Sequence, residues 1–358
     1  MLTRVSRQHC ALVRPWRVHQ FCRMDAHLLS MRHIVPRQSR SVASCLSGST
    51  DLMRGFKDRL RPLGPGGISL SLDDENGLAT LVLDNHERRN ALSGKMMAQL
   101  ADAVDELERW DTGVALVVHG AGGSFCAGAD LSMAREHLIT GTDGRVMCAL
   151  MSDTLTRLRS LPLISVAAID GAAIGGGAEL CTSCDFRVAG PDSSIRFVQV
   201  KMGVSTGWGG GARLASIVGR RAALRLLGWS PSIAADEGLA IGLLDAVATE
   251  EVGALAEARS FLSGVLEQDS REAVRAVKNV VAAADHPVSE QLRRAEEDHF
   301  SALWGAAHNR SRVRQLRFLG TPSSFLSLQF WQGGMLSPPA FWHELCCCSA
   351  SKRSHRRA

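Results

Sequence analysis

Apolar and polar residues alternate where regular patterning first begins along the chain. Serines alternate with apolar residues over 68–72, a polar turn occupies 73–77, and a second apolar run covers 78–83. Alternation with a period of two is typical of strands, and a short polar turn joins two of them into a hairpin. We therefore expect an ordered body that begins near Gly64 with a β-hairpin.

The spacing becomes helical after Ser93. Apolar residues then recur every three or four positions, at Met96, Met97, Leu100, Val104 and Leu107. Serine is a favoured N-terminal cap because its hydroxyl accepts a hydrogen bond from a free backbone N–H. The pattern predicts an amphipathic helix that starts at Ser93.

Two unbroken apolar runs, over 113–119 and 163–169, predict buried strands, and glycines follow each of them. The second run leads into a glycine turn, a helix over 178–184 and a further strand over 186–189. Strands that alternate with helices in this order predict an α/β fold with a largely parallel sheet.

Helical spacing continues to about Phe318. We expect short helices over 220–228 and 234–239, and longer ones over 251–266, 271–284 and 287–304. The patterns divide the chain into a basic extension over 1–63, a domain over 64–318 and a tail over 319–358. The domain has a core over 64–230 and a helical part over 231–318. Both ends are expected to be disordered, with a targeting signal as the alternative for the first.

The net charge of +5 comes from the two ends of the chain. The first 60 residues carry 11 Lys or Arg against 3 Asp or Glu, whereas residues 61–309 carry 22 against 32. An acidic body argues against nucleic-acid binding, which needs a clustered basic face. No apolar run reaches the ~18 residues of a membrane span. We therefore expect neither a nucleic acid nor a membrane as a partner.

Two glycine turns follow predicted strands, and each opens a predicted helix. The first is Ala127-Gly128-Ala129-Asp130, and the second runs from Gly171 to Gly177 with Glu179 just beyond it. Glycines let the backbone approach a ligand closely and leave N–H groups free at a helix start. Such N–H groups can stabilise an oxyanion that develops on a carbonyl oxygen. The two turns together indicate an enzyme rather than a scaffold.

At these residues the chain resembles the crotonase (enoyl-CoA hydratase/isomerase) superfamily. The similar segments, within 64–316, are Arg89 to Leu92, Phe125 to Leu131, Asp170 to Leu180, Cys184 to Arg187 and Gly207 to Leu214. The resemblance implies a crotonase-type spiral of ββα units with a helical C-terminal region, assembled as a homotrimer or hexamer. It also implies an acyl-CoA substrate whose enolate is stabilised by the backbone N–H groups of Ala129 and Gly176.

The resemblance further implies a set of substrate contacts. The expected residues are Arg88, Arg89, Ala91, Ala127, Gly128, Asp130, Leu131, Gly175 and Trp208. The two arginines would meet the CoA phosphates, with ordinary exposed arginines as the alternative. Trp208 would line the acyl pocket, and Asp130 would start a helix. By resemblance we expect a cytosolic protein, whereas eight arginines within the first fifty residues favour a mitochondrial transit peptide as the alternative.

The family's hydration route uses two carboxylates, one on each side of a water molecule. Glu179 matches the first, but the second position holds Gln199, and an amide is no general base at neutral pH. Lys201 is close in sequence, yet an offset of two residues would require different packing. The missing carboxylate therefore disfavours hydration. The resemblance in the wider wording of the sequence implies decarboxylation of a 2-alkylmalonyl-CoA thioester instead.

Decarboxylation requires the thioester oxygen to be held while CO₂ leaves, followed by protonation of the enolate. The thioester itself is the electron sink, so we expect no metal or redox cofactor. Gln199 would donate a hydrogen bond to the departing carboxylate, or only fill a gap. Glu179 would orient a water molecule, supply the proton, or only cap a helix. The alternatives are a hydratase, isomerase or thioester hydrolase, and an inactive CoA-binding subunit.

Overall fold

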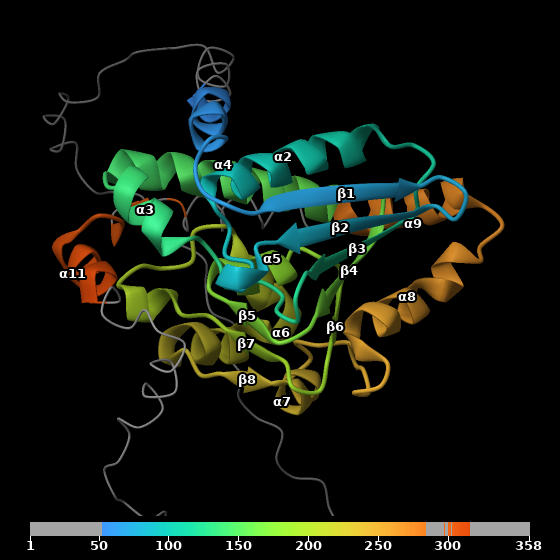
Figure 1. The fold of residues 1–358 in the computed structure, drawn as a ribbon. Helices are drawn as coiled ribbons and strands as arrows, with labels where there is room; N and C mark the ends of the chain where they lie inside the picture. Colours follow the sequence, from blue (N-terminus) through green and yellow to red (C-terminus); the bar gives the residue numbers. More distant parts are fainter. Residues whose placement is uncertain (1–51, 284–296, 298–299, 302, 316–358) are drawn as a thin grey trace, which may run out of the picture. The chain divides into compact units, whose positions relative to one another are not determined.

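The computed structural model describes residues 52–283, 297, 300–301 and 303–315, all within the second of two compact units, Gly48–Ala358. Within these residues a six-stranded sheet has the strand order β1-β2-β3-β4-β6-β9 (Figure 1). Its strands are β1 (Gly67–Asp73), β2 (Leu78–Asp84), β3 (Ala115–Gly120), β4 (Ile164–Ile169), β6 (Phe186–Ala189) and β9 (Ala246–Val247). β1 and β2 are antiparallel, and every later pair is parallel.

A smaller sheet branches from the end of β4. It has the order β5 (Ala172–Ile174), β7 (Ser194–Arg196) and β8 (Ile233–Ala234), with β5 parallel to β7. The chain leaves the main sheet through Gly171, whose φ of 60° is in the left-handed region. A Cβ at this position would lie 2.4 Å from the backbone oxygen of Gly123. Glycine at 171 therefore lets the small sheet start directly beside the loop that follows β3.

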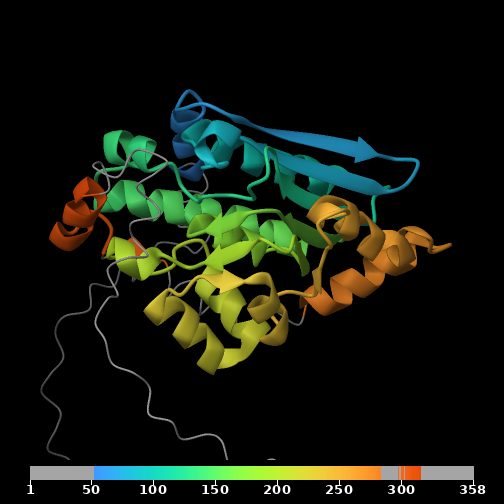
Figure 2. The same ribbon diagram turned by 60° about the horizontal axis from the view of Figure 1, so that its bottom comes forward.

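Helices cover both faces of the main sheet (Figure 2). Helices α2 (Gly94–Arg109) and α4 (Gly141–Ser160) contribute to one apolar core, and α8 (Gly253–Leu266) contributes to a second core. Along β3, Leu116 and Val118 belong to the first core, whereas Ala115 and Val117 belong to the second. Because both faces are covered, this strand is apolar at every position from 115 to 118.

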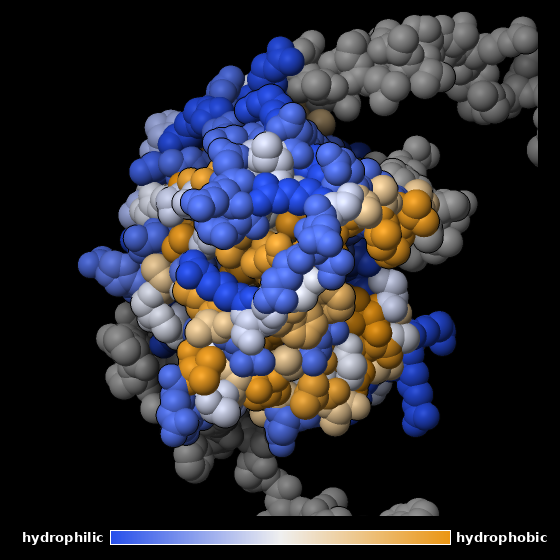
Figure 3. Space-filling model, turned by 90° about the vertical axis from the view of Figure 1, so that its right-hand side faces the viewer, coloured by the Kyte–Doolittle hydropathy of each residue, from blue (hydrophilic) through white to orange (hydrophobic). Residues whose placement is uncertain are grey.

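The remaining elements are shorter or peripheral. They are the 3₁₀ helices η1 (His86–Arg88) and η2 (Gln199–Met202) and the helices α3 (Leu131–His137), α5 (Gly176–Cys181), α6 (Gly210–Trp229), α7 (Ala235–Ala240), α9 (Arg271–Ala283) and α11 (Ala307–Gln315). Figure 3 shows apolar side chains gathered among polar ones on the face toward α8 and α9. The large exposed apolar side chains of these two helices are Phe261, Val277, Val280 and Val281.

The structure confirms the predicted α/β class and several of the predicted elements. The hairpin forms between β1 and β2, with Gly67 opposite Asp84. The hydroxyl of Ser93 accepts a hydrogen bond of 3.2 Å from the N–H of Met96, so the predicted helix is capped as expected. None of the helices formed by the described residues is long and apolar enough to cross a bilayer.

Other boundaries differ from the sequence expectations. The helix expected over 220–228 is the second half of α6, which is divided at Gly219 by a non-helical φ of 75°. A helix over 52–60 also buries Phe56 and Leu60 in the main core, so the packed body reaches further toward the N-terminus than Gly64. Most of the helix expected over 287–304 lies outside the described residues, as do the segments 1–51 and 316–358.

Candidate active site

The first glycine turn lies between β3 and α3. Leu92 pairs with Ala129 in an isolated parallel bridge. The N–H of Leu92 donates to the oxygen of Gly128 at 2.7 Å, and the N–H of Asp130 donates to the oxygen of Leu92 at 2.9 Å. In such a bridge the middle residue directs its own N–H away from the partner strand. The N–H of Ala129 accordingly has no hydrogen-bond partner in the described part of the chain.

The second glycine turn joins β5 to α5. Gly175 has a φ of 56°, and its N–H donates to the oxygen of Arg196 at 2.8 Å. Gly176 is the first residue of α5, where backbone N–H groups have no partner within the helix. Within the described residues, none accepts a hydrogen bond from the N–H of Gly176. A second free N–H therefore lies at this turn.

Close backbone packing brings the two turns together. Cys126 pairs with Ala173 in a parallel bridge, which ties the first loop to β5. A Cβ at position 128 would lie 2.9 Å from the backbone nitrogen of Gly176, and one at position 177 would lie 2.1 Å from the oxygen of Cys126. Side chains at these two positions would separate the turns. The glycines thus place the loop of Ala129 against the N-terminus of α5.

Glu179 lies one helical turn beyond Gly176 and is only 2% exposed. Its Oε2 accepts hydrogen bonds from the N–H groups of Trp208 at 2.8 Å and Gly210 at 3.0 Å. Its Oε1 accepts one from Nε2 of Gln199 at 2.7 Å and a longer one from the N–H of Gly207 at 3.4 Å. All four lone-pair positions of the carboxylate are therefore in use.

Glu179 also acts as a cap, but not of its own helix. The N–H of Gly210 is the first of α6, so the carboxylate neutralises free donors at the start of that helix. A Cβ at position 210 would lie 2.3 Å from Cγ of Glu179, so glycine is required there. The helix-capping alternative and a chemical role are thus compatible.

Burial dominates the electrostatics of this carboxyl group. It raises the pKa of Glu179, against the hydrogen bonds from Trp208 and Gly210, the charge of Arg213 and the hydrogen bond from Gln199. Arg213 is itself buried, and its Nη2 donates to the backbone oxygens of Glu179 at 3.1 Å and Trp208 at 2.7 Å. The guanidinium therefore fixes the segment that in turn holds the carboxylate.

Gln199 begins η2, and it is 8% exposed. One of its N–H groups is engaged by Glu179, whereas its buried Oε1 has no hydrogen-bond partner among the described residues. Lys201 lies on the same short helix and is exposed. The side chain beside Glu179 is therefore the amide and not the amine.

Trp208 is 3% exposed and connects Glu179 with the glycine turn. Its backbone N–H donates to Glu179, and its ring lies against Gly176. A Cβ at position 176 would lie 2.3 Å from the ring. Trp208 thus lies beside one of the two free N–H groups, where the sequence analysis placed a wall of the acyl pocket.

The expected CoA-binding residues surround the first glycine turn. Nη1 of Arg88 pairs with Asp130 at 2.7 Å, and Asp130 caps α3 by accepting hydrogen bonds from the N–H groups of Ser132 and Met133. Arg89 has a left-handed φ of 52° and is exposed. The structure therefore places Arg88 in an ion pair with another candidate residue and leaves Arg89 at the surface.

Two residues that the sequence analysis did not single out hold the site together. Asn90 is fully buried; its Oδ1 accepts from the N–H of Asn85, and its Nδ2 donates to the oxygens of Ala121 and Ser124. Arg213 is the other, as described above. Asparagine and arginine side chains are usually exposed, so only the place of these two residues in the crotonase-like motifs could have indicated that they are buried.

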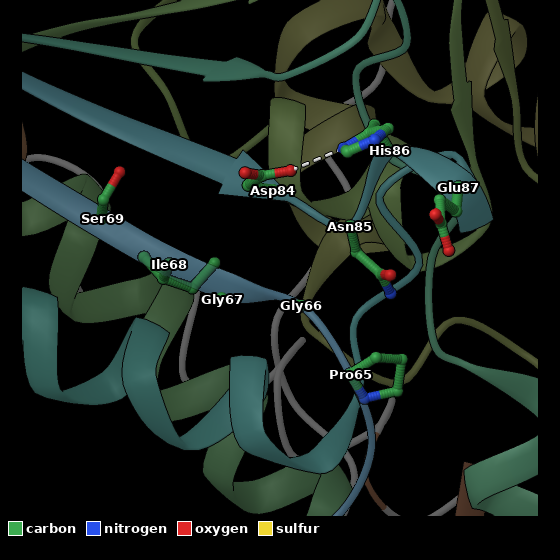
Figure 4. Close-up of a pocket in the computed structure, with 9 residues that line it drawn as sticks. All are labelled: Pro65, Gly66, Gly67, Ile68, Ser69, Asp84, Asn85, His86 and Glu87. Atoms are coloured by element: carbon green, nitrogen blue, oxygen red, sulfur yellow. Dashed lines mark hydrogen bonds and ion pairs between the residues drawn. The ribbon is translucent and has the colours of Figure 1, made fainter.

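A pocket of about 370 Å³ lies elsewhere, over the ends of β1 and β2 (Figure 4). It is lined by residues 65–69 and 84–87, and Nδ1 of His86 lies 3.0 Å from Oδ1 of Asp84 on its wall. None of the predicted site residues lines it. The glycine turns and the Glu179 cluster, rather than this pocket, remain the candidate active site.

The chain is similar in sequence to several known proteins. Ethylmalonyl-CoA decarboxylase from Gallus gallus is 43% identical over 270 residues, which cover 75% of this chain and 90% of that protein. The Xenopus laevis protein of the same name is 42% identical over 71% of this chain and 84% of its own length. The human protein of that name is 40% identical over 71% and 82%.

Solved structures match the fold. An enoyl-CoA hydratase/isomerase from Xanthobacter autotrophicus Py2 aligns with a TM-score of 0.65 at 23% identity, over 73% of this chain and 96% of that one. One from Mycobacterium paratuberculosis aligns with a TM-score of 0.65 at 21% identity, over 70% and 98%. The family model for enoyl-CoA hydratase/isomerase matches residues 73–317. The chain therefore belongs to the enoyl-CoA hydratase/isomerase, or crotonase, family.

Proposed function

We propose that the chain removes the free carboxylate from 2-alkylmalonyl-CoA thioesters, with ethylmalonyl-CoA as the preferred substrate, methylmalonyl-CoA as a slower one, and metabolite repair as the biological role. Relatives that are 40–43% identical over most of the chain make it an acyl-CoA carboxy-lyase. The single observation that carries the proposal is the amide of Gln199 at 2.7 Å from the carboxylate of Glu179.

The proposed reaction uses the two glycine turns. The bond between the α-carbon and the carboxylate breaks, CO₂ leaves, and the electron pair moves into the thioester. Negative charge then collects on the thioester oxygen, where the N–H groups of Ala129 and Gly176 would bind it. Loss of one such donor typically lowers the rate about 10²- to 10³-fold. The free state of both N–H groups supports this assignment.

Hydration would need a second general base, and Gln199 does not provide one. Its amide neither accepts nor releases a proton near neutral pH, so a water molecule beside it would not be activated for attack. Glu179 has all four acceptor positions engaged, which also disfavours its use as a lone base. The neutral amide of Gln199 suits decarboxylation, because the substrate itself carries the negative carboxylate and a second carboxylate beside it would repel it.

The second N–H of Gln199 would donate to the substrate carboxylate. In a site with little water, this bond would orient the C–C bond that breaks, while leaving the carboxylate less solvated than in bulk solvent. Glu179 would keep Gln199 in place and hold the segment from Gly207 to Gly210. Trp208 would pack against the acyl group beside Gly176.

The enzyme is expected to act on acyl-CoA as a homo-oligomer, a trimer or hexamer, in the cytosol. Exposed apolar side chains on α8 and α9 support self-association, because such patches commonly mark protein interfaces (Figure 3). The mass of the full-length protein in solution, measured by light scattering, tests the oligomeric state. A tagged fragment of residues 1–60 that enters mitochondria would overturn the cytosolic assignment.

The central test supplies the purified protein with three thioesters. We expect CO₂ and butyryl-CoA from ethylmalonyl-CoA, slower CO₂ release from methylmalonyl-CoA, and no hydration of crotonyl-CoA. Turnover of crotonyl-CoA without CO₂ release from either malonyl-type thioester would identify a hydratase instead. Binding of acyl-CoA without any product would identify an inactive CoA-binding subunit.

A further inference from the structure

One buried acceptor atom at the candidate site lacks a partner in the described part of the chain. Oε1 of Gln199 makes no hydrogen bond to any described residue, although Gln199 is only 8% exposed. A buried polar atom left unpaired costs about 1–3 kcal/mol, and folded proteins usually satisfy such atoms with protein groups or ordered water. Oε1 of Gln199 therefore indicates a missing hydrogen-bond donor.

The orientation of this amide is fixed by Glu179. Its nitrogen faces the carboxylate at 2.7 Å. Turning the amide over would bring its oxygen to that same distance from an oxygen that already accepts a hydrogen bond, and two acceptors repel. The carbonyl of Gln199 must then face away from Glu179.

The reacting end of the proposed substrate cannot supply the donor. The carboxylate and thioester oxygens of a 2-alkylmalonyl thioester are acceptors only. Water is a donor of the right size, and polar internal positions of this kind commonly hold it. We infer that the carbonyl oxygen of Gln199 binds a water molecule that protonates the enolate after CO₂ has left. This inference rests on the proposed decarboxylation.

The surrounding contacts link Gln199 to one of the two free N–H groups. Gln199 is bonded to Glu179, Glu179 accepts from the N–H of Trp208, and the ring of Trp208 lies against Gly176. Gly176 carries one of the two free N–H groups. The chain of contacts is short, so the acceptor and the N–H belong to one cluster.

The proton transfer balances with water as the only co-reactant. Loss of CO₂ leaves the electron pair in the enolate. The α-carbon then takes a proton from the water bound to Gln199, which becomes hydroxide. The hydroxide takes a proton from bulk solvent, so each turnover consumes one proton and releases one CO₂.

Glu179 would then be a positioning residue. A proton on either of its oxygens would point toward an N–H group, because Gln199, Gly207, Trp208 and Gly210 all donate to it. A neutral carbonyl such as that of Gln199 orients a water molecule without removing its proton. The water therefore stays a proton donor, whereas a carboxylate at position 199 would favour its use as a base.

The test follows where the new proton goes. Ethylmalonyl-CoA is decarboxylated in D₂O, and the configuration of the deuterated butyryl-CoA is measured. The wild-type enzyme should favour one configuration at least about tenfold, since about 1.4 kcal/mol between two transition states is enough. Gln199→Met, which keeps the length of the side chain but holds no water, should give nearly equal amounts of both. Val200→Ala, at an exposed neighbouring position, should behave as wild type.

A second measurement does not require decarboxylation. The wild-type enzyme should exchange the α-protons of butyryl-CoA with D₂O by the reverse of the protonation step, and Gln199→Met should slow this exchange about 10²-fold. Gln199→Asn keeps an amide, but its side chain is shorter by one methylene group, so the amide no longer reaches the same position. This variant should also exchange the α-protons slowly and give nearly equal amounts of both configurations. It serves as the second variant if Gln199→Met does not fold.

The outcomes separate the two proposals. If either folded variant releases CO₂ more slowly but keeps the configuration of the product and the exchange rate, the water at Gln199 is overturned and the decarboxylase remains. If the wild-type enzyme releases no CO₂ from ethylmalonyl-CoA, the proposed function fails, and the exchange assay alone decides the role of Gln199.

Discussion

The two glycine turns carry similar sequences, each with an acidic residue just beyond its glycines, yet the two carboxylates have different environments. Asp130 caps its own helix, α3, and pairs with the half-exposed Arg88. Glu179 lies inside α5, caps the following helix α6, and is held by three backbone N–H groups and Gln199. The charge of Asp130 is balanced by a half-exposed arginine, whereas Glu179 is held by backbone N–H groups and an amide.

This difference predicts different roles. A carboxylate with an arginine partner at the surface stabilises a loop and is readily replaced by another polar cap. A buried carboxylate that is surrounded by fixed donors holds its neighbours in well-defined positions, which a reaction centre requires. We therefore expect changes near Glu179, at the second turn, to alter the rate of the reaction itself. Changes at the first turn should alter how closely the loop of Ala129 approaches Gly176.

The largest effect is expected where the two turns meet. Gly128→Ala would place a methyl group 2.9 Å from the nitrogen of Gly176, so the thioester oxygen would lose at least one N–H donor. We expect kcat/KM for ethylmalonyl-CoA to fall about 10²- to 10³-fold. Steady-state CO₂ release measures this.

Gly123→Ala is the matched control for that variant. Gly123 has a φ of 72°, similar to the 88° of Gly128, but a Cβ there would meet nothing within 4 Å. Gly123→Ala should lose about 1–2 kcal/mol of unfolding free energy through the left-handed backbone, and Gly128→Ala should lose more because its methyl group also meets backbone atoms. Only Gly128→Ala should lose activity. Equal losses of activity would show that backbone strain, and not contact between the turns, limits the reaction.

A smaller effect concerns stability and pH at Glu179. Burial raises the pKa of Glu179 from its ordinary value of 4.5, so the folded protein binds this proton more tightly than the unfolded chain. As pH rises above that value, the unfolding free energy of the wild type should fall relative to that of Glu179→Gln, by about 1.4 kcal/mol for each unit of pH. The fall should stop once the pH exceeds the pKa of Glu179 in the folded protein. Urea unfolding between pH 4 and pH 8 measures the difference.

For Asp130→Asn, the difference in stability from the wild type should change with pH in the opposite direction. Burial alone would raise the pKa of Asp130, but the hydrogen bonds from Ser132 and Arg88 lower it below its ordinary value. The wild type should therefore be more stable than Asp130→Asn above the unfolded pKa, and lose this advantage as pH falls through the folded one. If both variants respond to pH with the same sign, the contrast between the two carboxylates is wrong.

The smallest effect is expected at Arg88. Its side chain is 48% exposed, and ion pairs between exposed groups contribute about 0.2–1 kcal/mol. Arg88→Met should therefore lower the unfolding free energy by less than about 1 kcal/mol, with Arg109→Met, at the exposed end of α2, as the control. A much larger loss of unfolding free energy, measured by thermal or urea unfolding, would mean that the ion pair between Arg88 and Asp130 stabilises the whole loop around Ala129.

Much of the fold was predictable because its signals are local. The period of two over residues 68–83 determines a hairpin, and the spacing after Ser93 determines a helix with its cap. The helix over 52–60 was missed because two buried residues in a basic segment, Phe56 and Leu60, produce little periodicity. The helix expected to begin at 220 does follow the break at Gly219, but the first half of α6, from Gly210, was not predicted.

The sequence by itself determined the family-like order of motifs, the two glycine turns, and the presence of one carboxylate and one amide where a hydration site would have two carboxylates. Those features depend on which residues are present and on their order. Only the tertiary structure decided that Glu179 caps α6, that the nitrogen of Gln199 faces Glu179, and that no described residue donates a hydrogen bond to the oxygen of Gln199. Hydrogen bonds between residues 20 to 31 positions apart depend on how the elements pack, and no local pattern records that.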